Sequence, residues 1–450
     1  MPHVYKIRKG LNINLTGKAE KSFGKSNPAD LYAVKPTDFH GLIPRLEVKE
    51  GAEVKAGSPL FVDKNIPEIR FTSPVSGIVA AINRGERRMV LEVVVKASNV
   101  QQYEVFNTGD PLEMTRESVI DNLLKSGLWP VVRQRPYNII ANPKHTPKSI
   151  FVSSFDTAPL APELDYVITG SEAEFQVGIN ALTRLTNGKV HVNISTEYPE
   201  KNVFSTVQHA QVNIFSGPHP AGNLSVQIQR IDPLNKGEVI WVVSPQDVVM
   251  LGRLFSKGIY DATKVVAVAG SEVKNPRYFR VISGSSVKSI VEGNVLDGPH
   301  RYIGGNPLTG TQVSAGGFIG FYDSLLSVIP EGNQYEFLGW ALPGFNKYSF
   351  SRSYWSWLTP GRSYVLDTNM KGGHRAFVIT GLYEKVFPLD IYPMQLLKSI
   401  LAEDVDQMEK LGIYEVAEED FALCEFVCPS KTEMQTLVRK GLDLMIQEMS

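Results

Sequence analysis

The sequence predicts a multidomain chain that combines α/β and α+β architecture. Its 450 residues correspond to about three domains at roughly 150 residues each, and its 43% hydrophobic and 21% charged residues are ordinary globular usage. Short β-rich runs separated by turns fill residues 41–96, and strand and helix patterns alternate in 115–260. These observations divide the chain into four predicted regions, 1–105, 106–260, 261–335 and 336–450.

Charge, cysteine content and hydropathy exclude several classes of protein. With 46 basic and 47 acidic residues the formal net charge is −1, which gives a nucleic-acid role little electrostatic support. Two cysteines are too few for a disulfide framework or for the roughly four thiolates of a cubane iron–sulfur cluster. The N-terminal residues lack an apolar signal region, and the longest apolar candidate, 316–330, is interrupted by Asp323. We therefore expect no membrane span, and a chain that is cytosolic or peripheral on a membrane partner.

The strands of 41–96 predict a small sandwich with a candidate modification site. Asp63-Lys64, ahead of the turn 73–77, resembles the lysine hairpin of lipoyl and biotinyl domains, so the barrel-sandwich hybrid is the expected shape. The gap to the turn is longer than in those domains, and Pro67 interrupts the hairpin. We expect Lys64 to be unmodified. The alternative function is a lipoyl-type carrier or acyltransferase component that uses Lys64.

The second region predicts a Rossmann-like α/β domain with a largely parallel sheet. Ser171 is the expected N-cap of a helix that ends at Gly188. A further helix covers Glu117–Lys125. The expected strands are 149–155, 166–170, 190–194 and 211–215.

One segment of this region differs from nucleotide-binding α/β domains. Residues 126–143 occupy the place where a flavin- or NADH-binding domain carries glycines whose amides close on a phosphate. Pro130 and Pro136 have no amide donor. Arg133 and Arg135 could meet an anion, but a structural or interface role is the preferred interpretation.

The third region predicts hairpins around one helix. We expect a strand at 263–270 that pairs with 277–282, a helix at 285–291, and strands at 317–323 and 325–329.

The fourth region begins with irregular aromatic sequence and ends in helices. Residues 340–375 carry Trp340 and many other aromatic residues, and the chain is predicted to be helical from 394. The last helix shows an apolar stripe of Met434, Leu437, Val438, Leu442, Met445 and Met449.

Three further residues are candidates for chemistry. Cys424 and Cys428, followed by Pro429, resemble the closing part of a bacterial ferredoxin motif, but two thiolates cannot hold a cubane. We expect both to be buried and inert. His219 lies between two prolines without a second metal-ligating residue at suitable spacing, so we expect a structural role.

Taken together, these segments resemble the A subunit of the bacterial sodium-translocating NADH:quinone reductase. The resemblance covers essentially the whole chain, and it implies a barrel-sandwich hybrid, an α/β domain without its flavin loop, a β-grasp (SLBB-like) unit and a helical end with a ferredoxin remnant. The motifs that carry it are 40–61, 71–88, 215–222, 385–391 and 418–431. The same plan is similar to the C subunit of the Rnf complex and to the flavin-bearing subunit of respiratory complex I. Those relatives carry a glycine-rich flavin loop and cluster cysteines, and this sequence departs from them at both places.

The resemblance implies a function in a redox-driven ion pump. Six subunits pass electrons from NADH to quinone and export sodium, with flavins and iron centres in the partner subunits and quinone as the substrate. The chain itself is expected to bind no cofactor and no metal and to have no catalytic residue. It is expected on the cytoplasmic face of the inner membrane, docked on membrane subunits, with a link to quinone binding.

A candidate partner surface lies in residues 347–364. This segment holds six aromatic residues and two arginines without a helical or strand period. Aromatic and Arg residues dominate protein interfaces. We expect Trp355 and Trp357 to face the membrane subunits, with Arg352 or Arg362 at the rim. The alternative is that the rings pack within the chain itself.

Overall fold

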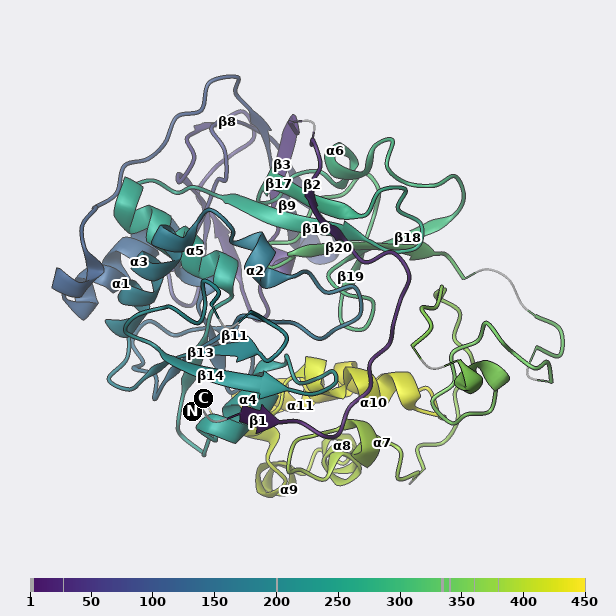
Figure 1. The fold of residues 1–450 in the computed structure, drawn as a ribbon. Helices are drawn as coiled ribbons and strands as arrows, with labels where there is room; N and C mark the ends of the chain where they lie inside the picture. The colour runs from purple at the N-terminus through teal and green to yellow at the C-terminus, as the bar shows by residue number, and fades with distance from the viewer. Residues whose placement is uncertain are drawn as a thin grey trace.

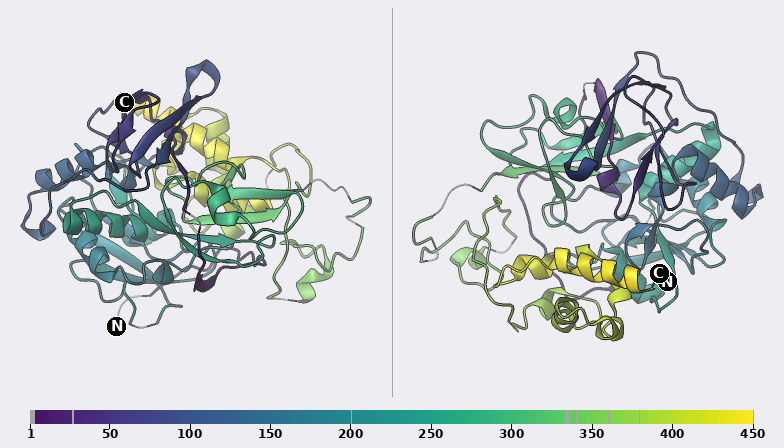
Figure 2. Two further views of the ribbon diagram at one scale, coloured as in Figure 1. Left: turned by 90° about the horizontal axis from the view of Figure 1, so that it is seen from above. Right: turned by 180° about the vertical axis from the view of Figure 1, so that it is seen from behind.

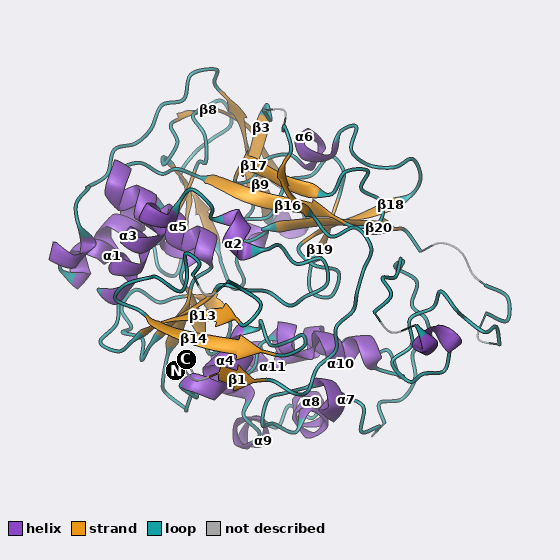
Figure 3. Ribbon diagram, viewed as in Figure 1, coloured by secondary structure: helices purple, strands orange, loops and turns teal. Residues whose placement is uncertain are grey.

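The computed structural model contains three sheet-based domains and a set of C-terminal helices (Figure 1). Figure 3 shows strands that reach the upper edge of the molecule, while helices gather at its left side and along the bottom. The structure describes residues 4–26, 28–199, 201–332, 336–339, 341–359, 361–378 and 380–449.

The α/β domain has a seven-stranded sheet in the order β1-β14-β13-β12-β15-β10-β11. Parallel pairing joins β1, β14, β13, β12 and β15, whereas β10 and β11 are antiparallel additions, so the predicted largely parallel sheet is confirmed. The strand bounds are β1 Val4–Lys6, β10 Arg133–Arg135, β11 Ile139–Ile140, β12 Ile150–Ser153, β13 Val190–Ser195, β14 Gln211–Ser216 and β15 Ile240–Val242. The helix bounds are α1 Arg116–Ser126, α2 Leu164–Val167, α3 Glu172–Thr183, α4 Leu224–Ile231 and α5 Pro245–Lys257.

Both faces of this sheet are buried. Alternate residues of β12 point to opposite sides: Ile150 and Val152 join the core of α3 and α5, and Phe151 joins the core of α4 and the C-terminal helices. The helices α3 and α5 cross so closely that only glycine fits at position 252. A Cβ there would lie 1.7 Å from the carbonyl oxygen of Glu174.

Two expectations for this domain are wrong. Residues 166–170 form no strand. Residues 164–167 form the short helix α2 instead, in which the amide of Val167 donates to the Glu163 carbonyl. The ring of Tyr166 packs on that of Tyr278 in the β-grasp domain. Helix α3 ends at Thr183 rather than at Gly188. Ser171 does occupy its N-cap position, but its hydroxyl makes no capping bond and accepts one from Arg253 instead.

The barrel-sandwich domain packs a four-stranded sheet, β3-β9-β8-β5, against a three-stranded sheet, β4-β6-β7. The core between them includes Phe61 and Phe71, whose stacked rings lie 4.8 Å apart. Its bounds are β3 Leu31–Val34, β4 Pro44–Leu46, β5 Glu53–Val54, β6 Pro59–Asp63, β7 Arg70–Thr72, β8 Gly77–Arg84 and β9 Val90–Ala97. The predicted sandwich of short strands is confirmed.

The β-grasp domain has a six-stranded sheet in the order β19-β18-β20-β16-β17-β2. The predicted antiparallel pairing of β16 with β17 is confirmed, as is the short helix α6. The bounds are β2 Glu20–Phe23, β16 Thr263–Ala269, β17 Arg277–Ile282, α6 Val287–Val291, β18 His300–Gly304, β19 Thr311–Val313 and β20 Leu325–Pro330. The predicted strand at 317–323 is wrong, because these residues form a loop.

The first two strands belong to sheets that are completed much later in the sequence. β1 pairs with β14 of the α/β domain, and β2 pairs with β17 of the β-grasp domain. Only with β3 does the chain enter the barrel-sandwich domain.

The C-terminal helices cover the second face of the α/β sheet (Figure 2). In the predicted stripe of α11, the side chains of Met434, Val438, Leu442 and Met445 are buried, Leu437 is partly buried, and that of Met449 lies outside the description. The bounds are α7 Tyr383–Val386, α8 Pro393–Leu401, α9 Val405–Lys410, α10 Ala422–Val427 and α11 Met434–Met449. Within the described ranges, the 3-10 helices are η1 Pro36–Asp38, η2 Glu86–Arg88, η3 Pro111–Glu113, η4 Trp129–Val131, η5 Trp355–Leu358, η6 Ile413–Glu415 and η7 Glu418–Phe421.

The described residues between 336 and 378 form an irregular projection beside these helices. All views in Figures 1 and 2 show its loops extending away from the body of the molecule. Within the described residues, no helix of the chain combines the length and the apolar character that crossing a membrane requires.

Candidate functional sites at the domain junctions

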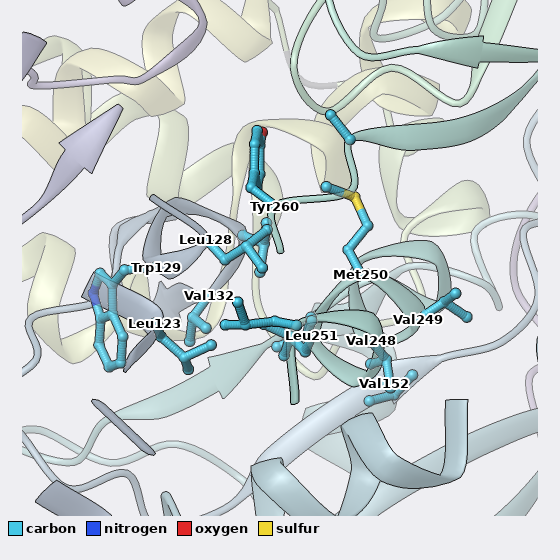
Figure 4. Packing of buried hydrophobic residues seen from close by; sticks show 14 of the residues in the cluster. Leu123, Leu128, Trp129, Val132, Val152, Val248, Val249, Met250, Leu251 and Tyr260 are labelled. Carbon is cyan, nitrogen blue, oxygen red and sulfur yellow. The ribbon is translucent and has the colours of Figure 1, made fainter. Parts of the chain in front are cut away.

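The segment at the expected flavin-loop position is packed with side chains. Trp129 is buried, donates its indole N–H to the Ala141 carbonyl at 2.7 Å and meets Trp241 edge to face at 5.4 Å. Leu128 and Val132 extend the same core toward α5 (Figure 4). This segment therefore serves as core between β10 and the helices.

The two arginines of this segment contact other domains of the same chain, which agrees with the preferred structural or interface interpretation. Arg133 lies over the ring of Tyr322 at 5.0 Å. Arg135 is buried and pairs with Glu419 at 2.9 Å. Arg439 on α11 strengthens the same contact by donating to the Tyr137 carbonyl at 2.7 Å. The flavin-loop position and the cysteine-bearing segment are thus joined by charge-assisted hydrogen bonds.

The two cysteines lie in an apolar environment. Cys424 and Cys428 are buried, and the hydroxyl of Tyr383 lies 3.1 Å from the Cys428 sulfur. Burial, with smaller effects of Glu384 and Cys428, raises the pKa of the Cys424 thiol well above its usual value. Among the described residues, no group of three or more His, Cys, Asp or Glu side chains could hold a metal ion.

His219 is buried, and its contacts are with neighbouring residues of the chain. Its ring nitrogen Nδ1 is 3.1 Å from the Thr157 hydroxyl, and its backbone amide donates to the Asn12 side chain at 2.8 Å. Burial lowers the pKa of His219 to about 4, so the imidazole is neutral at physiological pH. These contacts agree with the expected structural role.

Lys64 lies on the exposed connection between β6 and β7. Its backbone amide donates to the Ile43 carbonyl at 2.8 Å, and the side chain of Asp63 caps the amide of Asn65 at 2.9 Å. That Lys64 carries no modification remains a prediction.

The predicted partner surface divides into exposed and packed aromatic residues. Trp355 and Trp357 are 57% and 50% exposed. Tyr348, by contrast, packs on Phe426 of α10 at 5.5 Å. Trp340 lies outside the described residues. The projection therefore packs on the C-terminal helices through rings such as that of Tyr348, while Trp355 and Trp357 remain on the surface.

The two predicted arginines lie beside those tryptophans. Arg352 lies over the ring of Trp357 at 6.0 Å. Arg362 donates to the Phe345 carbonyl at 3.1 Å and to the Asn346 side chain at 2.7 Å. The structure thus groups Arg352, Trp355, Trp357 and Arg362 within one projecting segment.

A buried charged cluster, which the sequence analysis missed, lies where the three sheet domains meet. We call it the three-domain junction and define it by Lys35, Asp38, Asp247, Lys264 and the loop 317–323. Lys264 on β16 donates to the carbonyl oxygens of Gly320 at 3.2 Å and Phe321 at 2.9 Å. Asp38 accepts from the amide of Phe321 at 2.8 Å and pairs with Lys35 at 3.3 Å.

These bonds explain why 317–323 is not a strand. Its backbone groups bond to side chains and to residues of the α6 turn: the Phe318 carbonyl accepts from Lys35, and the amide of Gly320 donates to Asp323. A neighbouring strand could pair with this segment only by displacing these hydrogen bonds. The sequence signal was Lys264 itself, a cation within the otherwise apolar strand run of residues 263–269.

The electrostatics of the junction are governed by burial. Burial raises the pKa of Asp38, although Lys35 opposes this shift. Burial lowers the pKa of Lys264, and Asp323, Asp247 and Asp38 oppose it in that order. A cavity of about 10 Å³, enough for one water molecule, adjoins the cluster and is lined by residues of all three domains, among them Tyr260 and Phe321.

Family comparisons give these domains an identity. Three family models match: the NqrA N-terminal barrel-sandwich hybrid domain over residues 5–98, the NqrA second alpha/beta domain over 114–260, and the NQRA C-terminal domain over 265–315. The chain is therefore a multidomain protein of the NqrA type. It belongs to the family of the A subunit of the Na(+)-translocating NADH-quinone reductase.

Curated relatives match the chain from end to end. The A subunits of this reductase from Pasteurella multocida and Hahella chejuensis are each 38% identical over 98% of this chain and 99% of their own length. The protein of the same name from Yersinia pestis bv. Antiqua is 37% identical with the same coverage. Among solved structures, an NAD+-reducing [NiFe]-hydrogenase in the air-oxidized state has a TM-score of 0.38 and 11% identity over 77% of this chain and 67% of the other.

Proposed function

We propose that this chain works as a cofactor-free subunit of a membrane-bound NADH:quinone oxidoreductase that couples quinone reduction to sodium export. The observation that carries the proposal is the identity of 38% over 98% of the chain to relatives that bear the name of this reductase. In this proposal, electrons pass through flavins and iron centres of the other subunits of a six-subunit complex, and this chain supports assembly and the quinone site.

The proposal that the chain binds no flavin and no cluster rests on what fills the two relevant places. Trp129 occupies the core at the flavin-loop position, and Arg135 is taken by Glu419. The Cys428 sulfur lies 3.1 Å from the Tyr383 hydroxyl, and the Cys424 thiol donates to the Tyr383 backbone carbonyl at 4.0 Å. At the flavin-loop position and at the two cysteines, the side chains are thus already engaged in contacts within the chain.

The assembly role is supported by the projection 336–378. Large apolar side chains that lie together on the surface are a usual mark of an interaction surface. Here Trp355, Trp357 and Leu358 are each at least 50% exposed on one 3-10 turn, with Arg352 and Arg362 nearby. We propose that this surface docks on the membrane subunits at the cytoplasmic face of the inner membrane.

The docking role is tested with Trp355→Ala plus Trp357→Ala. Loss of a Trp anchor typically costs 2 kcal/mol or more in binding, roughly thirtyfold in affinity. We expect the variant subunit to separate from the complex during size-exclusion chromatography. Because both rings are half exposed, the melting temperature of the isolated variant should stay close to the original value.

A matched control is Tyr392→Ala, which removes a 68% exposed ring from the helical region outside the projection. This variant should remain in the complex. A double tryptophan variant that melts far lower on its own would place the rings in the core, and one that stays bound would reject the docking surface.

A further inference from the structure

The loop 317–323 folds around an ammonium group that the chain itself supplies. We propose that this loop and the surrounding aspartates form a cation socket, that the Lys264 ammonium is its occupant, and that this occupant holds the three-domain junction together. The socket goes beyond the proposed function, since no step of electron transfer or docking requires it.

The direct ligands of the ammonium are two backbone carbonyl oxygens. Nζ of Lys264 donates to Gly320 and Phe321, and Lys264 is only 7% exposed. No carboxylate among the described residues lies within ion-pair distance of Nζ, so the aspartates act on it through their longer-range field. Carbonyl oxygens with nearby negative charge are the environment that small monovalent cations prefer.

The charges around the ammonium come from all three domains. Asp38 belongs to the barrel-sandwich domain, Asp247 to the N-terminus of α5, and Asp323 to the β-grasp domain; each attracts the charged lysine. Two further cations face the cluster. Lys35 pairs with Asp38, and Arg133 attracts Asp247. Without Lys264, three carboxylates would face two cations in a poorly solvated region, which is unfavourable.

The same loop carries the contacts between domains. Its Phe321 amide bonds Asp38, and its Phe318 carbonyl accepts from Lys35 at 3.3 Å, both in the barrel-sandwich domain. The Tyr322 hydroxyl donates to the Pro130 carbonyl of the α/β domain at 2.7 Å. Because Lys264 fixes the two carbonyls in the middle of the loop, we infer that it is a positioning residue for both interfaces.

Chemical rescue tests the socket in the full-length chain. Lys264→Ala lacks three carbons and the ammonium, which n-propylammonium supplies. We expect this variant to melt roughly 5 °C or more below the original protein, and n-propylammonium chloride to restore its melting temperature with a saturable dose dependence. Neutral 1-propanol and the bulky tetramethylammonium ion should restore nothing. Lys288→Ala, which removes a 71% exposed lysine from the same domain, is the control and should melt normally.

Two results would overturn the proposal: equal rescue by 1-propanol, or a Lys264→Met variant with an unchanged melting temperature. If Lys264→Ala does not fold, the comparison moves to Lys264→Met with and without Asp323→Asn. The socket predicts that the double variant melts higher than the single one, because the unbalanced carboxylate is gone. A double variant that melts no higher than Lys264→Met rejects it.

Discussion

At the scale of single residues, Cys424 and Cys428 allow a direct test of whether the two thiols take any part in electron transfer. We expect Cys424→Ala plus Cys428→Ala to leave quinone reduction by the assembled complex intact. The cost should appear in urea unfolding of the isolated chain, at about 1 kcal/mol for each buried side chain. A variant that assembles normally but cannot reduce quinone would show that the thiols take part in electron transfer.

Single residues also show where sequence reasoning fails. The burial of the two cysteines and the structural role of His219 were predictable from the sequence. The other cysteines of a cluster motif are missing, and no second metal-ligating residue lies at suitable spacing from His219. The junction around Lys264 was not. Asp38, Asp247 and Asp323 are far apart in the sequence, and a lone charge in an apolar run does not reveal which distant carboxylates will surround it.

At the scale of elements, the contact between η7 and the α/β domain should depend on pH through Asp420. Its carboxylate accepts from the amide of Ala417 at 2.8 Å and from Asn223 at 3.2 Å. Burial, assisted by Glu419 and opposed by Arg135, raises the pKa of Asp420 from 3.8 to about 6. The folded state therefore holds this proton more tightly than the unfolded state, and its stabilising contribution is lost as the pH rises from about 4 through about 6.

Asp420→Asn removes this dependence. The variant should gain stability relative to the original protein between pH 5 and pH 7.5, by on the order of 1 kcal/mol, as measured by urea unfolding at several pH values. The exposed control Asp406→Asn, on α9, should show no such trend. A constant difference between Asp420→Asn and the original protein at every pH would contradict the assignment.

Elements were predictable where their periodicity was strong. The helix α1, the pairing of β16 with β17 and the parallel strands β12, β13 and β14 follow from apolar patterns. Residues 166–170 and 317–323 are equally apolar, but tertiary contacts to Tyr278, Asp38 and Lys264 outweigh their local preference for strands. β1 and β2 are short and polar, and their partners lie about 200 residues or more away, so no local pattern identifies them.

At the scale of the whole molecule, the proposed lack of cofactors predicts a colourless protein. After incubation of the isolated chain with flavin mononucleotide, and separately with iron and sulfide, the absorbance between roughly 350 and 500 nm should show no stoichiometric band. The reason is that side chains such as Trp129 fill the flavin-loop position, while the chain has two thiols. A bound flavin or cluster after gel filtration would contradict the proposal.

The placement of β1 and β2 also has a consequence for how the chain is made. A ribosome releases β1 and β2 before the strands that they pair with, because β14 ends at Ser216 and β17 ends at Ile282. The barrel-sandwich domain, whose strands lie between residues 31 and 97, can close much earlier. During synthesis β1 and β2 therefore remain unpaired beside a domain that has already folded, and nascent chains halted before Ser216 should be the most prone to aggregate.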